Sequence, residues 1–204
     1  MLQYQIPTSG CEQIRDNVAA LIALELKNQF DEYGEDIFSC DIYADRDTPF
    51  SQSDGIGFVT VNLSGTQESK HTPASFNSNI SIDVLVNIAT FATDESLGDA
   101  ESRRKVVRLC KAIEYILQSC EYYDYLKTGN SVFVTQQQRV TQVAFGNPFE
   151  SHDSVNCASG RVSLEIDILE QNIQETPNLI AGVDFIAKFE NNNTGFKVII
   201  QENI

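Results

Sequence analysis

The spacing of apolar residues along the chain predicts two helices. Between residues 11 and 30 an apolar side chain recurs every fourth position, which gathers these side chains on one helical face. This stripe consists of Ile14, Val18, Ile22, Leu26 and Phe30. Ser9 is a suitable N-cap, and Gly34 follows the helix beyond an acidic turn. The second helix is expected over residues 99–120, with Asp99 as its N-cap. Its expected buried face consists of Val106, Cys110, Ile113, Leu117 and Cys120.

Strict alternation of apolar and polar residues predicts strands in other parts of the chain. In residues 79–91 every second residue is branched at Cβ, which favours a strand over a helix. Residues 159–170 alternate just as regularly, as expected for a strand with one face in the core and one in water. The less regular strands are expected at 36–43, 57–64 and 131–144. The third of these is expected to be bent or bulged near its glutamines, and the polar residues 64–78 to form a long loop.

The last thirty residues predict a separate small element. Two short strand-like runs, 182–189 and 195–201, flank the turn-forming sequence ENNNTG, so a β-hairpin is expected. The order is therefore helix, three strands, helix, two strands and hairpin. This order favours an α+β fold, with two helices on one face of an antiparallel or mixed sheet. We expect one domain over residues 1–174 and a hairpin extension over 175–204.

Composition and charge narrow the function classes. With 204 residues and 42% hydrophobic content the chain can build its own core without a metal or disulfide. No apolar run approaches the roughly 20 residues that span a membrane, and the first residues lack the features of a secretory signal. We therefore expect folding in a cytoplasm and no membrane partner. The net charge of −15 argues against non-specific binding of nucleic acid.

The charges are unevenly distributed along the sequence. The acidic cluster follows the first predicted helix and consists of Asp31, Glu32, Glu35 and Asp36. The basic stripe, on the exposed face of the second predicted helix, consists of Arg104, Arg108 and Lys111. Opposite charges at two separated places on one molecule suit a head-to-tail contact between copies. Two independently solvated faces are the alternative interpretation.

No group of residues has the pattern of a catalytic or metal site. His152 has a potential nucleophile and orienting group nearby, but catalytic groups need rigid supports and these lie in one polar loop. Asp41, Asp45 and Asp47 lack the glycine and closing glutamate of an EF-hand loop. The five cysteines include no CxxC pair. We expect no catalytic residue, no metal and no cofactor, and hence a protein that is not an enzyme.

Tyrosines gather at the end of the second predicted helix. They are Tyr115, Tyr122, Tyr123 and Tyr125. A tyrosine buries its ring and keeps its hydroxyl in water, which is why this residue is common in protein interfaces. Ordinary packing at a helix end is the alternative.

The order of elements resembles the tail terminator (tail completion) family of long-tailed bacteriophages. The resemblance covers roughly residues 10–170. It rests on the strand–turn–helix passage NISIDVLVNIATFATDESLGDAESRRKVVRLCKAIEYIL and on the alternating strand SGRVSLEIDILE. It implies a structural virion protein that forms a ring of six subunits at the head-proximal end of the tail tube. Such a ring ends tube polymerisation and provides the surface on which the head docks.

The resemblance also implies partners and a place in the virion. The partners would be further copies of this chain, the tail tube protein and the head–tail connector or neck proteins, with assembly in the host cytoplasm. DNA would pass through the lumen without specific binding. The polar run Gln136, Gln137, Gln138 and Arg139 is a candidate for sheet-edge contact between copies, beside the two charged clusters. Another neck protein, for head–tail joining or head closure, and a monomeric α+β binding or adaptor domain are the alternatives.

Overall fold

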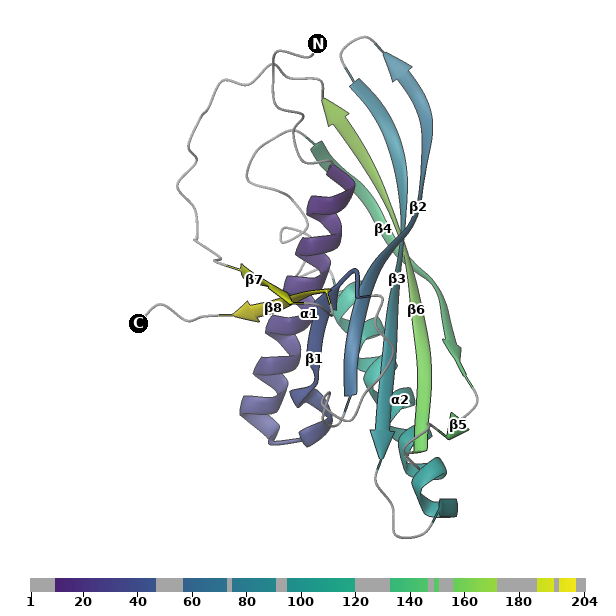
Figure 1. Ribbon diagram of the computed structural model, residues 1–204. Helices are drawn as coiled ribbons and strands as arrows, with labels where there is room; N and C mark the ends of the chain where they lie inside the picture. Colours follow the sequence, from purple (N-terminus) through teal and green to yellow (C-terminus); the bar gives the residue numbers. More distant parts are fainter. Residues whose placement is uncertain are drawn as a thin grey trace.

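The computed structural model confirms an α+β fold in which two helices pack on one face of a mixed sheet (Figure 1). It describes residues 10–46, 57–72, 75–90, 95–119, 133–146, 149–150, 156–171, 187–192 and 195–200. The helical elements are α1 (Gly10–Tyr33), the 3₁₀ turn η1 (Asp36–Ser39) and α2 (Glu95–Gln118). The strands are β1 (Asp41–Ala44), β2 (Gly57–Thr72), β3 (Ser75–Thr90), β4 (Phe133–Phe145), β5 (Phe149–Glu150), β6 (Asn156–Gln171), β7 (Ala187–Asn192) and β8 (Gly195–Ile200).

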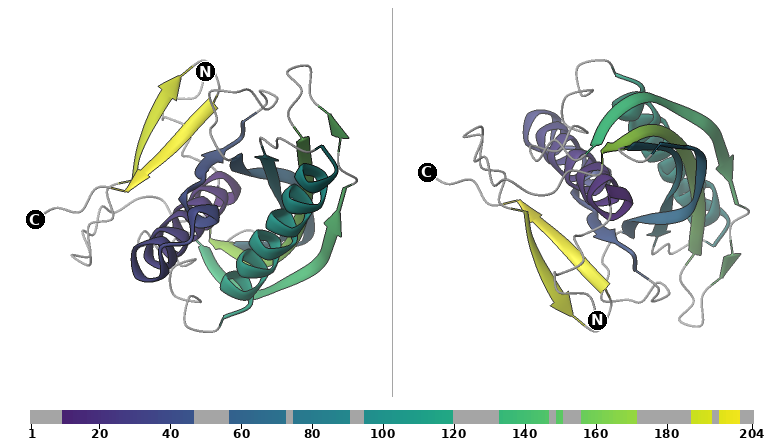
Figure 2. Two further views of the ribbon diagram at one scale, coloured as in Figure 1. Left: turned by 90° about the horizontal axis from the view of Figure 1, so that it is seen from below. Right: turned by 90° about the horizontal axis from the view of Figure 1, so that it is seen from above.

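The strand order across the sheet is β4-β6-β3-β2-β1-β8-β7, and β5 also pairs with β6. Only β1 and β2 are parallel neighbours among the described strands; the other pairs are antiparallel. Figure 2 shows that the sheet is curved and that both helices lie on its concave side. Helix α1 packs mainly on β1 and β2, and α2 packs mainly on β6, β3 and β4.

The core lies between the concave face of the sheet and the helices. The alternating residues of β3 and β6 meet there in register, with Val84 opposite Val162 and Ile82 opposite Leu164. All four side chains are at most 1% exposed. Burying a side chain of this size contributes roughly 2 kcal/mol of hydrophobic free energy, so the two long strands are held mainly by their shared apolar face.

Helix α1 forms because its apolar stripe faces the sheet. Ile14, Val18, Ile22 and Leu26 are buried as expected, but Phe30 is at the surface. The helix ends at Gly34, whose φ of 67° is the left-handed conformation that glycine adopts without strain. The Gly34 N–H donates to the Phe30 carbonyl oxygen at 2.8 Å, which satisfies one of the last free carbonyls of the helix. The proposed N-cap, Ser9, lies outside the described residues.

Helix α2 packs closely against the sheet because β6 has a glycine where the two elements meet. A Cβ atom on Gly160 would lie 2.5 Å from the Cys110 Sγ atom and 2.8 Å from a methyl of Val106. The predicted buried face is confirmed for Val106, Cys110, Ile113 and Leu117, while Cys120 lies outside the described residues.

The start of α2 was predicted wrongly. The helix begins at Glu95, so Asp99 is inside it and is not its N-cap. Gly98 made the preceding residues resemble a turn. A glycine in a helix costs roughly 1 kcal/mol relative to alanine, and packing of the rest of the helix offsets that cost.

The expected strand at 36–43 is also corrected. Residues Asp36–Ser39 form η1, and only Asp41–Ala44 form β1. Local hydrogen bonds explain the difference. The Phe38 N–H donates to the Glu35 carbonyl oxygen at 2.9 Å, and the Ser39 hydroxyl donates to the Asp36 carbonyl oxygen at 2.7 Å.

The predicted long loop at 64–78 does not exist in that form. Strand β2 continues to Thr72 and β3 begins at Ser75, and their pairing runs through this region with register shifts at Leu63/Gly65 and Glu68/Lys70. Strand β3 also pairs with β6 as far as Ser75 opposite Gln171. Backbone hydrogen bonds on both sides thus extend β3 through residues whose side chains show no apolar alternation.

The C-terminal hairpin is present as β7 and β8, which pair from Ala187–Ile200 to Asn192–Gly195. Strand β7 continues past the predicted end at residue 189, and residues 182–186 and 201 of the predicted runs lie outside the described residues. Strand β8 pairs with β1 through Tyr43 opposite Lys197 and Ala44 opposite Phe196. The hairpin therefore continues the main sheet instead of forming a separate layer.

Candidate assembly surfaces

Strand β4 forms one edge of the sheet. Its only strand neighbour among the described residues is β6, so one side of its backbone has no partner strand there. An edge of this kind can pair with a strand of another chain. The predicted irregularity near the glutamines is confirmed, because the register shifts between Thr135 and Gln137 and again between Val140 and Gln142.

The polar run on β4 divides between the two faces of the sheet. Gln137 and Arg139 are exposed, whereas Gln138 is half-buried and its amide donates to the Leu117 carbonyl oxygen at 3.1 Å. Gln138 thus joins the edge strand to the last turn of α2. The backbone of Gln136 belongs to β4, but its side chain lies outside the described ones.

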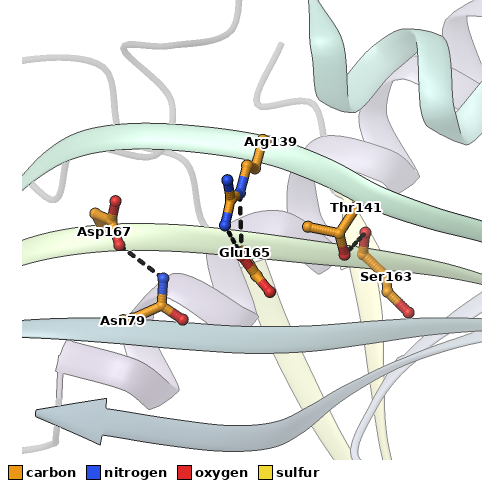
Figure 3. Close-up of polar contacts among 6 residues, drawn as sticks. All are labelled: Asn79, Arg139, Thr141, Ser163, Glu165 and Asp167. Carbon is orange, nitrogen blue, oxygen red and sulfur yellow. Dashed lines mark hydrogen bonds and ion pairs between the residues drawn. The ribbon is translucent and has the colours of Figure 1, made fainter.

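A network of polar contacts covers the convex face of the sheet, away from the helices (Figure 3). The Arg139 guanidinium on β4 pairs with the Glu165 carboxylate on β6 at 2.5 Å. The Asn79 amide on β3 donates to the Asp167 carboxylate at 2.7 Å. These contacts join β4, β6 and β3 side by side, and they keep this face hydrophilic.

The basic stripe of α2 is exposed as predicted, but it is not far from the acidic cluster. Arg108 on α2 forms an ion pair with Glu35, which lies between α1 and η1. The Arg108 guanidinium also lies 5.9 Å from the centre of the Phe38 ring. The expectation of two separated charged places is therefore wrong for these residues, because folding brings η1 against α2. That the clusters contact another copy stays a prediction.

The other members of the two clusters differ in their surroundings. Lys111 pairs with Glu114 at 2.5 Å, and Asp31 pairs with Lys27 at 2.7 Å. The predicted interface residues without an ion pair to any described residue are Arg104, Glu32 and Asp36. The carboxylate of Glu32 accepts a hydrogen bond from the Tyr33 hydroxyl, which raises the pKa of Tyr33.

A pocket opens between α1 and the segment that contains η1 and β1. Its volume is about 580 Å³ including its open mouth. The lining residues are Ala23, Leu26, Lys27, Phe30, Phe38, Ser39, Cys40, Asp41 and Ile42. The lining therefore combines apolar side chains with polar groups, and Lys27 and Asp41 place one charge of each sign in its wall.

The pocket and its surroundings were missed by pattern analysis. Phe30 was assigned to the buried stripe of α1, although it is 36% exposed and lines the pocket. The acidic residues that follow it, Asp31 and Glu32, were the available signal. Of the tyrosine cluster, Tyr115 is 78% exposed, and the other three tyrosines lie outside the described residues.

The candidate chemical sites lie only partly within the described residues. Asp45 forms an ion pair with Arg15, which also contacts Asp16, and Asp47 lies outside the described residues. His152, Asp153 and Ser154 lie outside them too, and Cys157 is buried in β6. Within the described ranges no three residues of the metal-binding types come together.

The cysteines within the described residues form no disulfide with one another. They are Cys11, Cys40, Cys110 and Cys157. Burial raises the pKa of Cys40 to about 12 and that of Cys110 to about 12, so both thiols are protonated near neutral pH. A thiol with so high a pKa is a poor nucleophile and a poor metal ligand.

None of the described helices is long and apolar enough to cross a membrane.

Comparisons with known proteins add no family to this description. No protein-family model matches the chain, and a search of curated proteins likewise finds no match.

Proposed function

We propose that this chain is a structural subunit of a phage tail, which forms a hexameric ring at the head-proximal end of the tail tube. The ring ends polymerisation of the tube protein and provides the docking surface for the head. The support comes from the resemblance in element order and from the two edges of the sheet.

The observation that carries the proposal is the presence of two different strand edges at opposite ends of one sheet. Strand β4 forms one edge and β7 the other. A ring needs a heterologous contact, in which one patch meets a different patch on the next copy and the rotation closes. Pairing of β4 with β7 of the next copy is a contact of this type, and backbone hydrogen bonds would supply much of its affinity.

The irregularities of β4 make this edge selective. Bulges and charged side chains are the features by which proteins keep an edge from pairing with arbitrary strands. Two register shifts and Arg139 give β4 both features. Only a partner edge that matches the short regular stretches, Gln137–Val140 and Gln142–Phe145, would pair with it.

The charge of the chain is compatible with passage of DNA. Each copy has a net charge of −15, so six copies have a charge of −90 (6 × −15). A wall of this sign repels phosphate and gives the DNA no basic surface on which to stop.

The first test is the mass and shape of the full-length protein. One chain has a mass of 22.7 kDa, and light scattering should give six times that value or a multiple of it. Electron microscopy should show closed rings. Added to a polymerising tail tube protein, the ring should shorten the tubes and be found at one end. A protein that stays monomeric with the tube protein present would be an adaptor domain and not a terminator.

The edge contact has its own test in Gln136→Pro, with Gln136→Ala as the matched control. Gln136 is at the first register shift and has no register partner on β6, so a proline there should disturb pairing within the chain less than at a paired position. The proline variant should keep the circular dichroism spectrum of the wild type and lose the ring, whereas the alanine variant should keep the ring. A proline variant that still forms rings would exclude pairing at the beginning of β4 as the ring contact.

A further inference from the structure

The surface on the helical side of the molecule has the composition of a protein interface. Among the described residues the exposed large hydrophobic side chains are Phe30, Tyr33, Tyr115 and Phe145, and the first three of these belong to the helices. The basic stripe of α2 lies on the same face of the helix as Tyr115, because residues 104, 108, 111 and 115 follow a spacing of three and four. Exposed aromatic residues and arginines are both enriched in protein interfaces.

These features form one continuous surface. Arg108 contacts Glu35 and lies over the ring of Phe38, and Phe38 lines the pocket together with Phe30. Tyr115 is seven residues, or roughly 10 Å of helix, beyond Arg108. We call the exposed stripe of α2, η1, the last turns of α1 and the pocket the helical surface.

The helical surface is complementary to itself. It holds a basic stripe and an acidic cluster side by side, and it holds both an exposed aromatic side chain, Tyr115, and a pocket. In a two-fold contact each residue i meets residue j while j meets i, so both halves of every pair must lie on the same surface. Opposite charges on one surface, and an exposed tyrosine and a pocket on that same surface, satisfy that condition. A contact that only closes a ring would place them on different sides of the subunit.

We propose that the helical surface binds the helical surface of a second copy of this chain about a two-fold axis. Tyr115 of each copy enters the pocket between α1 and η1 of the other. The basic stripe of each copy then lies over the acidic cluster of its partner, where Arg104 and Glu32 have no ion pair with described residues of their own chain. A tyrosine in a pocket, surrounded by further contacts that exclude water, is the usual arrangement of an interface hot spot.

This contact is independent of the proposed ring contact because it uses neither β4 nor β7. Without ring formation it gives a pair, with twice the mass of one chain. With ring formation it joins two rings of six face to face, which gives twelve times that mass. The mass of the particle in solution therefore distinguishes the two-fold contact from the ring contact.

The test compares Tyr115→Ala with Gln67→Ala in the full-length protein by light scattering and analytical ultracentrifugation. Tyr115 is so exposed that its truncation should leave the fold intact. Gln67 is an exposed residue on β2, which belongs neither to the helical surface nor to an edge of the sheet. Tyr115→Ala should halve the mass of the wild-type particle or weaken pairing at least ten-fold. Tyr115→Phe should retain the wild-type mass, and so should Gln67→Ala.

A photo-crosslinking amino acid at position 115 gives a direct measure of the contact. In a mixture of ¹⁵N-labelled and unlabelled protein, crosslinks should join position 115 of one copy to the pocket residues 23–42 of another. Crosslinks within one copy, or to β4, would overturn the proposal.

The outcomes distinguish the two proposals. A wild-type protein that is monomeric at high concentration overturns the pair, as does an unchanged particle mass in Tyr115→Ala. If Gln136→Pro reduces a larger wild-type particle to a pair of chains, both contacts are supported. If the wild type itself is only a pair that depends on Tyr115, the ring proposal fails and the pair stands.

Discussion

The guanidinium of Arg108 pairs with the carboxylate of Glu35, which lies 73 residues earlier in the chain. This contact joins the middle of α2 to the segment between α1 and η1. Because Arg108 and Glu35 meet within one chain, the basic stripe and the acidic cluster lie on one surface of the molecule. Arg108 is 58% exposed and Glu35 is 35% exposed, so solvent screens their interaction.

The first prediction is that this ion pair contributes little to stability. In a double-mutant cycle of Arg108→Ala and Glu35→Ala, the coupling free energy should be about 0.5 kcal/mol, as for other exposed pairs. Urea unfolding measures it, and about 0.5 M NaCl should reduce it because salt screens exposed charges. A coupling of about 2 kcal/mol or more, above the range of exposed pairs, would show that the pair holds η1 in place.

A second prediction concerns the contact between α2 and β6. Gly160→Ala should lower the free energy of unfolding by about 1–3 kcal/mol, because the new methyl overlaps the Cys110 Sγ atom and Val106. The control is Gly65→Ala, where an added Cβ meets nothing within 4 Å. Adding Cys110→Ala to Gly160→Ala should restore part of the loss. Equal stability of the two alanine variants would mean that α2 moves away from the sheet at no cost.

The third prediction is that the titration of Asp16 makes the free energy of unfolding depend on pH. Burial raises the pKa of Asp16 above its ordinary value of 3.8, although the hydrogen bonds from Arg15 oppose that rise. The folded protein therefore holds this proton more tightly than the unfolded chain does. The stability from this proton is fully present below pH 3.8 and is lost as the pH rises through the raised pKa.

Asp16→Asn removes this titration and keeps an oxygen that accepts from Arg15. The free energy of unfolding of the wild type, minus that of Asp16→Asn, should therefore decrease between pH 3.8 and neutral pH. Urea midpoints at several pH values measure the difference. An increase with pH would show that the Arg15 contact outweighs burial.

Thiol reactivity supplies the fourth prediction. With a pKa of about 12, the thiols of Cys40 and Cys110 should react with iodoacetamide far more slowly in the native protein than in urea. Mass spectrometry of the labelled peptides gives the rate for each site. Fast native labelling of Cys110 would mean that α2 separates from the sheet often enough to expose it.

Pattern analysis identified the buried faces correctly where strands and helices alternate regularly. Val84 and Val162 belong to the alternating segments 79–91 and 159–170, and the structure buries both and pairs them directly. It failed where backbone pairing continues without an apolar pattern, as in residues 64–78. It also failed where local hydrogen bonds compete with a strand, as at Asp36–Ser39. Side-chain periodicity indicates burial, but it does not indicate the partners of backbone groups.

The candidate surfaces were predictable only in part. The exposure of Arg104, Arg108 and Lys111 followed from helical spacing, because the opposite face of α2 is apolar. The edge position of β4 did not follow from its own sequence, since it depends on which strands β6 pairs with. The pocket at Phe30 needed both α1 and η1 in place.

The residue pattern alone was enough to assign the core-facing side chains of the regular elements, because that choice depends on a local backbone repeat and on hydrophobic burial. Three relationships required the folded chain: Arg108 and Glu35 are neighbours, β4 and β7 are edges, and Tyr115 and the pocket share one surface. Each of them joins segments far apart in the chain. They are set by the packing of two helices on one curved sheet, and no local repeat encodes that packing.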